Sequence, residues 1–226
     1  MLSVVIPTLN AEASLSRTLA CLVGPAARGL VREVIVADGG STDMTRGIAD
    51  ATGATVIDAP RGRGSQLRAG AEAARHDWLL FLHADTALEE TWEREVESYV
   101  VSPGAHERAA VFAYALDDFT AAARRLETVV RLRNKVLALP YGDQGLLVSR
   151  HLYNNVGGFA DLALMEDVDM VRRLGRKRLV NLRSRAVTSA ARYREGGYVA
   201  RPFRNVLVLS LYFLRVPTRV LVRLYG

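Results

Sequence analysis

The chain contains little cysteine, little lysine and no apolar run long enough to cross a membrane. Cys21 is the single cysteine among 226 residues, which excludes an internal disulfide and a zinc–thiolate cluster. The apolar stretch at 205–214 is well short of the roughly 20 residues that span a bilayer. No basic leader segment follows Met1. We therefore expect a protein of the reducing cytoplasm.

The basic residues are almost all arginine. Only Lys135 and Lys177 are lysines among the 30 basic residues, which leaves 28 arginines and a net charge of +6. The nucleotide composition of the genome is the simplest cause of this bias. Arginine also suits phosphate groups, because its planar fork donates two parallel hydrogen bonds. The charge alone is compatible with phosphorylated ligands, nucleic acid or an anionic membrane.

The overall composition is that of a folded globular protein, with 50% hydrophobic and 24% charged residues. This excludes wholesale disorder and a collagen-like chain. The length suits one large domain with a small appendage. We find no internal repeat, low-complexity tract or linker, and we expect one α/β domain followed by a helical tail.

Apolar runs rich in β-branched residues alternate with helix-like segments in the first half of the chain. Such alternation indicates βαβ units and a mainly parallel sheet. The second half is less regular, but its apolar periodicity still predicts strands and helices. The predicted strands are 2–6, 31–37, 54–57, 78–82, 110–115, a strand ending at 148, 179–182 and 186–189; the predicted helices are 11–22, 43–51, 65–75, 119–139 and 165–174.

Short polar clusters follow three of the predicted strands, at 7–10, 38–40 and 83–86. In open parallel sheets, ligands bind outside the carboxyl ends of the strands. One such cluster is weak evidence, because an acid after a strand often caps a helix or forms a turn. Three clusters on one sheet edge favour a binding site.

Asp85 is the candidate metal ligand at this edge. A hard cation such as Mg²⁺ or Mn²⁺ often takes only one or two carboxylates plus phosphate oxygens. His83 could assist Mn²⁺, although a lone histidine at a strand end is more often structural. Arg61, Arg63 and Arg68 flank a glycine-containing loop and could hold a diphosphate. This loop lacks the P-loop pattern and a complete dinucleotide-binding pattern.

A cluster of acids, Glu166, Asp167 and Asp169, opens a predicted helix. One interpretation is that the acids interact favourably with the positive end of the helix dipole. The other is that one of them is a general base, which takes the proton of a hydroxyl as a new bond forms. The local sequence does not separate the two.

Five motifs, in order over residues 2–195, resemble the family-2 glycosyltransferases of the GT-A fold. They read SVVIPTLN at 3–10, EVIVADGGSTD at 33–43, LLFLHADT at 79–86, PYGDQGLL at 140–147, and GGF through MEDVD at 157–169. The last two are also similar to a small bacterial subfamily associated with radical-SAM proteins and named for arsenosugar biosynthesis. The resemblance implies a GT-A domain over 1–195, with a Rossmann-like, mixed and mainly parallel sheet flanked by helices, and an amphipathic helical tail over 196–226.

The resemblance also implies an activity and a set of site residues. The enzyme would transfer a sugar from a nucleotide-diphosphate donor, typically a UDP-sugar, to an acceptor hydroxyl, with inversion and with Mg²⁺ or Mn²⁺. Asp85 would reach the metal, and Asp167 would be the catalytic base with Glu166 as its neighbour. The nucleotide would contact Pro7, Thr8, Asn10, Asp38 and Arg68, with Asp38 on the base, and Asp143 and Gln144 would face the donor sugar or the acceptor.

Two departures from the family pattern keep alternatives open. The family's D-x-D element reads His83-Ala84-Asp85, and its double aspartate reads Asp38-Gly39. A nucleotidyltransferase of similar fold would use the same sheet edge and release pyrophosphate. A non-catalytic membrane-surface module with a degenerate GT-A fold is the other alternative, and the retained acids Asp85 and Asp167 oppose it.

The tail is apolar and basic. Between 205 and 214 only Asn205 and Ser210 are polar, and three arginines follow at four-residue spacing, on one face if the helix continues through Pro217. Such a helix suits an anionic membrane and a lipid-linked acceptor, whereas the alternative is packing on the domain's own core. The sequence leaves both interpretations of the tail open, core packing or peripheral association with the inner face of the plasma membrane, and we expect no nucleic-acid partner. The arginines are Arg215, Arg219 and Arg223.

Overall fold

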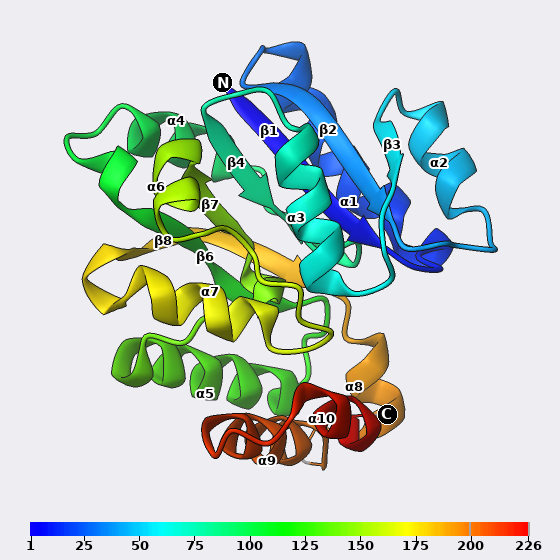
Figure 1. The fold of residues 1–226 in the computed structure, drawn as a ribbon, viewed down its shortest axis with the longest axis vertical. Coiled ribbons are helices and arrows are strands. Elements are labelled where there is room, and N and C mark those ends of the chain that lie inside the picture. The colour runs from blue at the N-terminus through cyan, green and yellow to red at the C-terminus, as the bar shows by residue number, and fades with distance from the viewer. Residues whose placement is uncertain (199, 226) are drawn as a thin grey trace.

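A mixed sheet of eight strands forms the centre of the computed structural model, which describes residues 1–198 and 200–225 apart from the side chains at 219, 223 and 225 (Figure 1). The strand order is β3-β2-β1-β4-β7-β6-β8-β5. This confirms the expected GT-A type of sheet, flanked by helices. The strands are β1 (Leu2–Thr8), β2 (Val31–Asp38), β3 (Thr55–Asp58), β4 (Trp78–Phe81), β5 (Thr86–Leu88), β6 (Ala109–Leu116), β7 (Leu146–Ser149) and β8 (Leu179–Thr188).

The pairing of the strands brings most of their carboxyl ends to one edge. β1 is parallel to β2 and β4, and β2 is parallel to β3. β7 lies antiparallel between β4 and β6, and β6 is parallel to β8. Because β7 opposes both of its neighbours, β4 and β6 run in the same direction. The ends of β1, β2, β4, β6 and β8 therefore share the edge at which ligands bind in such sheets.

Helices cover both faces of the sheet, which explains why its central strands are mostly apolar on both sides. Leu2, Val4 and Ile6 of β1 pack into the core with α1 and α4, whereas Val5 packs on the opposite face with α3, α6 and α7. The helices are α1 (Glu12–Ala27), α2 (Thr45–Ala51), α3 (Arg63–Ala73), α4 (Trp92–Val100), α5 (Ala121–Leu137), α6 (Arg150–Asn155), α7 (Glu166–Leu174), α8 (Ala191–Gly196), α9 (Ala200–Phe213) and α10 (Thr218–Tyr225), with short 3₁₀ turns η1 (Ala105–Glu107), η2 (Gly142–Gln144) and η3 (Arg176–Arg178).

The prediction of two short strands at 179–182 and 186–189 is wrong, because β8 is continuous. Arg183 and Arg185 point to solvent, while Leu182, Ser184 and Ala186 are buried. This alternation is that of a strand with one buried face. The short elements β5, α4 and α6 were not predicted from the sequence.

The tail is helical, as expected, but it forms two helices, so the condition for Arg215, Arg219 and Arg223 to share one face, a helix that continues through Pro217, is not met. α9 ends at Phe213, Arg215 has a φ of +62°, and α10 begins only after Pro217. Proline lacks the N–H that a continuing helix requires. The side chains of Arg219 and Arg223 lie outside the described residues.

One side of the tail packs on the domain. Val208 and Leu209 of α9 and Leu221 of α10 are buried with Leu164 and Val168, the latter from α7. The sequence alternative of core packing is therefore confirmed for this side. Within the described chain, each helix is too short or too polar to cross a bilayer.

Candidate active site

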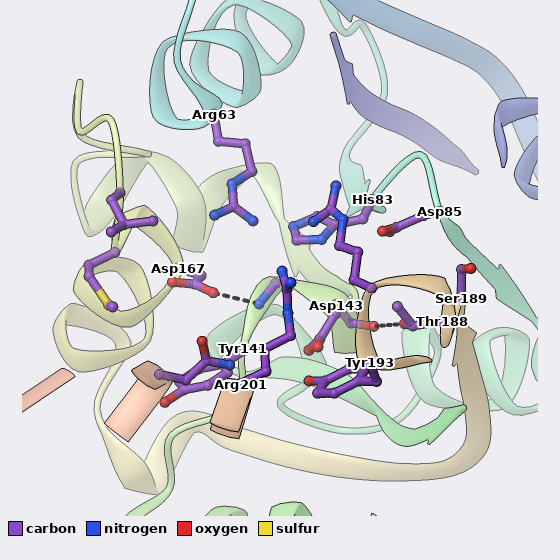
Figure 2. Close-up of a pocket in the computed structure, with 15 residues that line it drawn as sticks. Arg63, His83, Asp85, Tyr141, Asp143, Asp167, Thr188, Ser189, Tyr193 and Arg201 are labelled. Carbon is purple, nitrogen blue, oxygen red and sulfur yellow. Dashed lines mark hydrogen bonds between the residues drawn. The ribbon is translucent and has the colours of Figure 1, made fainter. Parts of the chain in front are cut away.

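A pocket with an empty volume of about 750 Å³, open to solvent, lies at the carboxyl edge of the sheet (Figure 2). Segments far apart in the sequence meet there: the first residue of α3, the end of β4, η2, the start of α7, the end of β8, and α8 and α9. Its polar lining comprises Arg63, His83, Asp85, Tyr141, Asp143, Asp167, Thr188, Ser189, Arg192, Tyr193, Arg201 and Asn205.

Asp167 faces this pocket and is held by two backbone hydrogen bonds. The N–H of Gly142 donates to Oδ2 at 2.7 Å, and the N–H of Val168 donates to Oδ1 at 2.7 Å (Figure 2). The carboxylate is thereby fixed between α7 and η2. A carboxylate fixed in an open pocket can exchange a proton with a ligand that binds there.

Gly142 also fixes the spacing between Asp167 and the end of β4. A Cβ atom built on Gly142 would lie 2.5 Å from Nε2 of His83 and 3.5 Å from Oδ2 of Asp167. The backbone of η2 therefore passes directly beside the imidazole. Burial and the nearby charge of Arg63 lower the pKa of His83 to about 4, so the ring is neutral at physiological pH.

Asp143 lines the same pocket and carries a buried oxygen, Oδ1, with no hydrogen-bond partner among the described residues. Burial raises the pKa of Asp143 to about 7; Arg133 opposes this, and the charges of Asp167 and Asp85 add to it. An unpaired buried oxygen costs free energy unless a ligand or water satisfies it. The pocket therefore offers a carboxyl group that can donate or accept a hydrogen bond near neutral pH.

Glu166 takes a different place from its neighbour Asp167. Its side chain is fully buried, and its Oε1 lies 2.9 Å from Nε of Arg63, the first residue of α3. Burial raises the pKa of Glu166, whereas the charge of Arg63 opposes the rise. Glu166 thus positions Arg63, whose guanidinium extends into the pocket (Figure 2).

Several lining residues at the end of β8 and after it were not predicted from the sequence as site residues. Thr188 ends β8 and Ser189 follows it at the ligand edge. Arg192 of α8 also lines the pocket, and the guanidinium of Arg201 lies 5.8 Å from the ring centroid of Tyr193.

The predicted nucleotide contacts form a second polar cluster at the ends of β1 and β2. Oδ1 of Asp38 accepts hydrogen bonds from Thr8 and Ser41, and Oδ2 accepts from the N–H groups of Gly40 and Ser41. Burial opposes ionisation of Asp38, but these hydrogen bonds outweigh it and hold the pKa below its usual value. Asp38 is 1% exposed, so it shapes this loop, and its contact with a base stays a prediction.

The other predicted contacts differ in their placement. Pro7 is buried in β1, and Asn10, at the exposed end of that loop, accepts a hydrogen bond from the N–H of Thr42 at 2.9 Å. Arg68 lies on the exposed side of α3, 3.0 Å from Glu72, and is absent from the pocket lining.

Gln144 does not face the pocket, in contrast to its neighbour Asp143. Its side chain is 1% exposed, donates to the carbonyl of Phe112 at 3.0 Å and accepts from Asn134 at 2.8 Å. Gln144 therefore fastens η2 to β6 and α5. The expectation that it contacts the donor sugar or acceptor is corrected by this geometry.

The carboxylates of the pocket suit a metal ion that is also coordinated by oxygen atoms of a bound ligand. Among the described residues, no group of three histidine, cysteine, aspartate or glutamate side chains could hold a metal ion. Asp85 supplies one carboxylate at the end of β4. Since Mg²⁺ commonly takes one or two carboxylates together with substrate phosphates, Asp85 fits an ion completed by a bound diphosphate.

The chain belongs to glycosyltransferase family 2, whose profile, described as glycosyl transferase family 2, matches residues 3–135. A search of curated proteins gives no match. The motifs around Asp143 and Asp167 lie beyond the matched range, so their roles rest on the geometry and on the resemblance in sequence.

Solved structures of glycosyltransferases share the fold. Glucosyl-3-phosphoglycerate synthase from Mycobacterium tuberculosis, in complex with Mn²⁺, UDP and glucosyl-3-phosphoglycerate, is 26% identical with a TM-score of 0.55, over 83% of this chain and 70% of that chain. The same enzyme with Mn²⁺, UDP-glucose and phosphoglyceric acid gives 26% identity and a TM-score of 0.55, over 81% and 69%. S. aureus TarS 1–349 is 17% identical with a TM-score of 0.65, over 92% and 63%, and shows the fold alone.

Proposed function

We propose that this glycosyltransferase transfers a hexosyl group from a UDP-sugar to an acceptor hydroxyl with inversion, and that Asp167 is its general base. The observation that carries the proposal is the convergence of Asp85, Asp143 and Asp167 on one open pocket at the ligand edge of a GT-A sheet. The mycobacterial relative that binds UDP-glucose supports the choice of donor. The narrower resemblance to the radical-SAM-associated subfamily stays a prediction.

The reaction is a single displacement. The acceptor hydroxyl loses its proton to Asp167 while its oxygen attacks the anomeric carbon of the donor. The bond between that carbon and the diphosphate oxygen breaks, and the electron pair leaves with the nucleoside diphosphate. Attack from the side opposite the leaving group inverts the configuration. The N–H groups of Gly142 and Val168 keep the carboxylate aimed during the transfer.

The leaving diphosphate would lie near Asp85 and the cationic side chains of the pocket. Asp85 would hold Mn²⁺ or Mg²⁺ together with the diphosphate oxygens, and the bound ion would neutralise charge that develops on the leaving group. The relative that binds Mn²⁺ and UDP supports this use of a metal. Arg63, fixed by Glu166, provides a permanent positive charge on the same side of the pocket.

We further propose that residues 1–195 form the glycosyltransferase domain and that the tail, 196–226, completes it. Arg201 and Asn205 of α9 line the pocket opposite the strand ends. In this arrangement the nucleotide lies toward β1, β2 and β4, and the acceptor enters from the side of α8 and α9.

Thermal unfolding with a panel of nucleoside diphosphates and nucleotide sugars, with and without Mn²⁺, tests the proposal. UDP compounds at 100 times their Kd should stabilise the protein by about 2.7 kcal/mol. Asp85→Ala should weaken UDP binding, and metal should have little effect without nucleotide. If every nucleoside diphosphate leaves the melting temperature unchanged with either metal, the site assignment is wrong.

A transfer assay separates the base from the binding residues. Asp167→Asn should keep UDP affinity and lose transfer, or lose donor hydrolysis where no acceptor is present. Wild-type turnover by Asp167→Asn would remove Asp167 from the mechanism. Release of pyrophosphate from a nucleoside triphosphate, in place of UDP from a UDP-sugar, would support the nucleotidyltransferase alternative.

A further inference from the structure

Exposed apolar side chains gather at one end of the molecule. In the described part of the chain, 18 large hydrophobic side chains are exposed, and 12 of them lie on α5 or between residues 203 and 224. The most exposed of these are Phe203 at 71% and Leu214 at 75%. Figure 1 shows α5, α9 and α10 together at the end of the molecule that lies away from the N-terminal strands. Contiguous exposed apolar surface marks an interaction site in a soluble protein.

Arg172 and Arg176 contact the ends of α9 and α5, the two parts of this apolar surface. Leu139, just after α5, is buried in the same cluster as α9. Arg176 donates hydrogen bonds to backbone carbonyls at the end of α5, including that of Val136 at 3.2 Å. The guanidinium of Arg172 lies 5.0 Å from the ring centroid of Phe213 at the end of α9. The ends of α5 and α9 therefore belong to one surface, which we call the basal face.

The basal face carries positive charge and no exposed carboxylate on these helices. Arg215, between α9 and α10, is exposed, and residues 196–226 include no aspartate or glutamate. The single acid of α5, Glu127, is 7% exposed and is paired with Arg124. Arg125, Arg131 and Lys135, in contrast, are exposed on α5.

We propose that the basal face, formed by α5, α9 and α10, binds an anionic phospholipid membrane. Apolar side chains surrounded by cations match the acyl boundary and the negative headgroups of such a surface. A second copy of the chain is a poor occupant, because pairing two basal faces would bring like charges together. The contribution of α5 is not expected from the tail sequence, and it makes the surface broader than one amphipathic helix.

With the basal face on a membrane, the pocket would lie beside the membrane surface. α9 presents Arg201 and Asn205 to the pocket, while Phe203 and Leu207 of the same helix are exposed. Resting on the proposed transferase activity, the geometry points to an acceptor hydroxyl carried by a lipid. The bond formed would be the glycosidic bond to that lipid-linked hydroxyl.

Co-sedimentation of the full chain with vesicles tests the membrane contact without nucleotide or metal. The protein should bind vesicles of phosphatidylglycerol and phosphatidylcholine, dissociate at high salt, and bind pure phosphatidylcholine weakly. Arg125→Gln, Arg131→Gln and Lys135→Gln together should weaken binding about 100-fold, from a general value of about 1 kcal/mol per cation at an anionic surface. Phe203→Ser with Leu214→Ser should also weaken it.

Matched controls use exposed apolar residues elsewhere. Val23→Ser and Val101→Ser, at positions 63% and 82% exposed, should leave binding unchanged. Thermal unfolding verifies that each variant is folded. The proposal is overturned if the wild type ignores anionic vesicles at low salt, if the α5 variant binds like the wild type, or if the protein forms a dimer that Phe203→Ser with Leu214→Ser dissociates. A chain that transfers sugar without binding vesicles would reject the membrane contact and leave the transferase intact.

Discussion

Substitution of Gly142 by alanine tests the site geometry most directly. The added Cβ would lie 2.5 Å from Nε2 of His83, whereas ordinary contacts begin at 3.4 Å, so the ring must retreat by about 0.9 Å. His83 is two residues before Asp85, and the N–H of Gly142 holds Asp167. One methyl group therefore disturbs both the proposed metal ligand and the proposed base.

The overlap between the added methyl group and His83 should lower both the stability and the activity of Gly142→Ala. Overpacking of this kind lowers the free energy of unfolding by about 1–3 kcal/mol. A displacement of about 1 Å at a reacting group lowers the rate by roughly 10²-fold. Urea denaturation and the rate of UDP release from a UDP-sugar measure the two effects separately.

A second substitution checks the cause. His83→Ala removes the obstructing ring, so Gly142→Ala should cost little stability in that background, as a double-mutant cycle would show. Gly47→Ala is the matched control, because its Cβ would meet only the flexible end of Met44 at 3.3 Å in helix α2; it should be neutral or stabilise by about 0.5–1 kcal/mol. Equal costs of Gly142→Ala in both backgrounds, or wild-type activity of the single variant, would refute the reasoning.

Three further outcomes are expected. Burial raises the pKa of Glu33, but hydrogen bonds from a serine, a histidine and an arginine outweigh it and lower the pKa from 4.5 to about 2. Glu33→Gln should therefore lower the free energy of unfolding by about 2–3 kcal/mol at pH 7. Urea denaturation should show this difference from the wild type shrinking as the pH falls from 4.5 toward 2. Arg63→Gln removes the cation beside the buried Glu166 and should lower the free energy of unfolding by about 3–5 kcal/mol at pH 8. The loss should be smaller at pH 5, where Glu166 is protonated. The exposed Arg68→Gln should change the free energy of unfolding by less than about 1 kcal/mol. Val208→Ala, at a fully buried position, should lower the free energy of unfolding by about 1–3 kcal/mol, and Val206→Ala, 59% exposed on the same helix, by less than about 0.5 kcal/mol.

The central strands were predictable because both of their faces are buried. Residues 2–6 are apolar except for Ser3, and residues 34–37 are apolar throughout; the structure extends the strands predicted at 2–6 and 31–37 by only one or two residues. β8 was not predictable as one strand, since Arg183 and Arg185 on its solvent face interrupt the apolar pattern. Ser189 and Arg192 lie at or just after the end of the strand predicted at 186–189, yet they were not predicted as site residues.

The side chains of neighbouring residues in two motifs point in opposite directions, and the spacing of residues in the sequence does not predict which of the two enters the pocket. In the stretch 140–147, Asp143 lines the pocket while Gln144 points into the protein toward Phe112. In the stretch 165–169, Asp167 faces the pocket while Glu166 is buried against Arg63. The short 3₁₀ turn η2 and the first turn of α7 decide these directions. The sequence therefore located the site, but the backbone selected which residue of each pair enters it.

The composition of the chain changes at residue 195, but the packing does not divide there. Val208, Leu209 and Leu221 are buried against Leu164 and Val168, close in sequence to Asp167. The same helix α9 supplies Arg201 to the pocket and Phe203 to the basal face. With the proposed membrane contact, α9 would reach the surface while its buried side chains stay packed with those of α7, the helix that begins with Glu166 and Asp167. A tail that lay free of the domain could bring the protein to a surface, but only a tail packed in this way can also orient the pocket toward it.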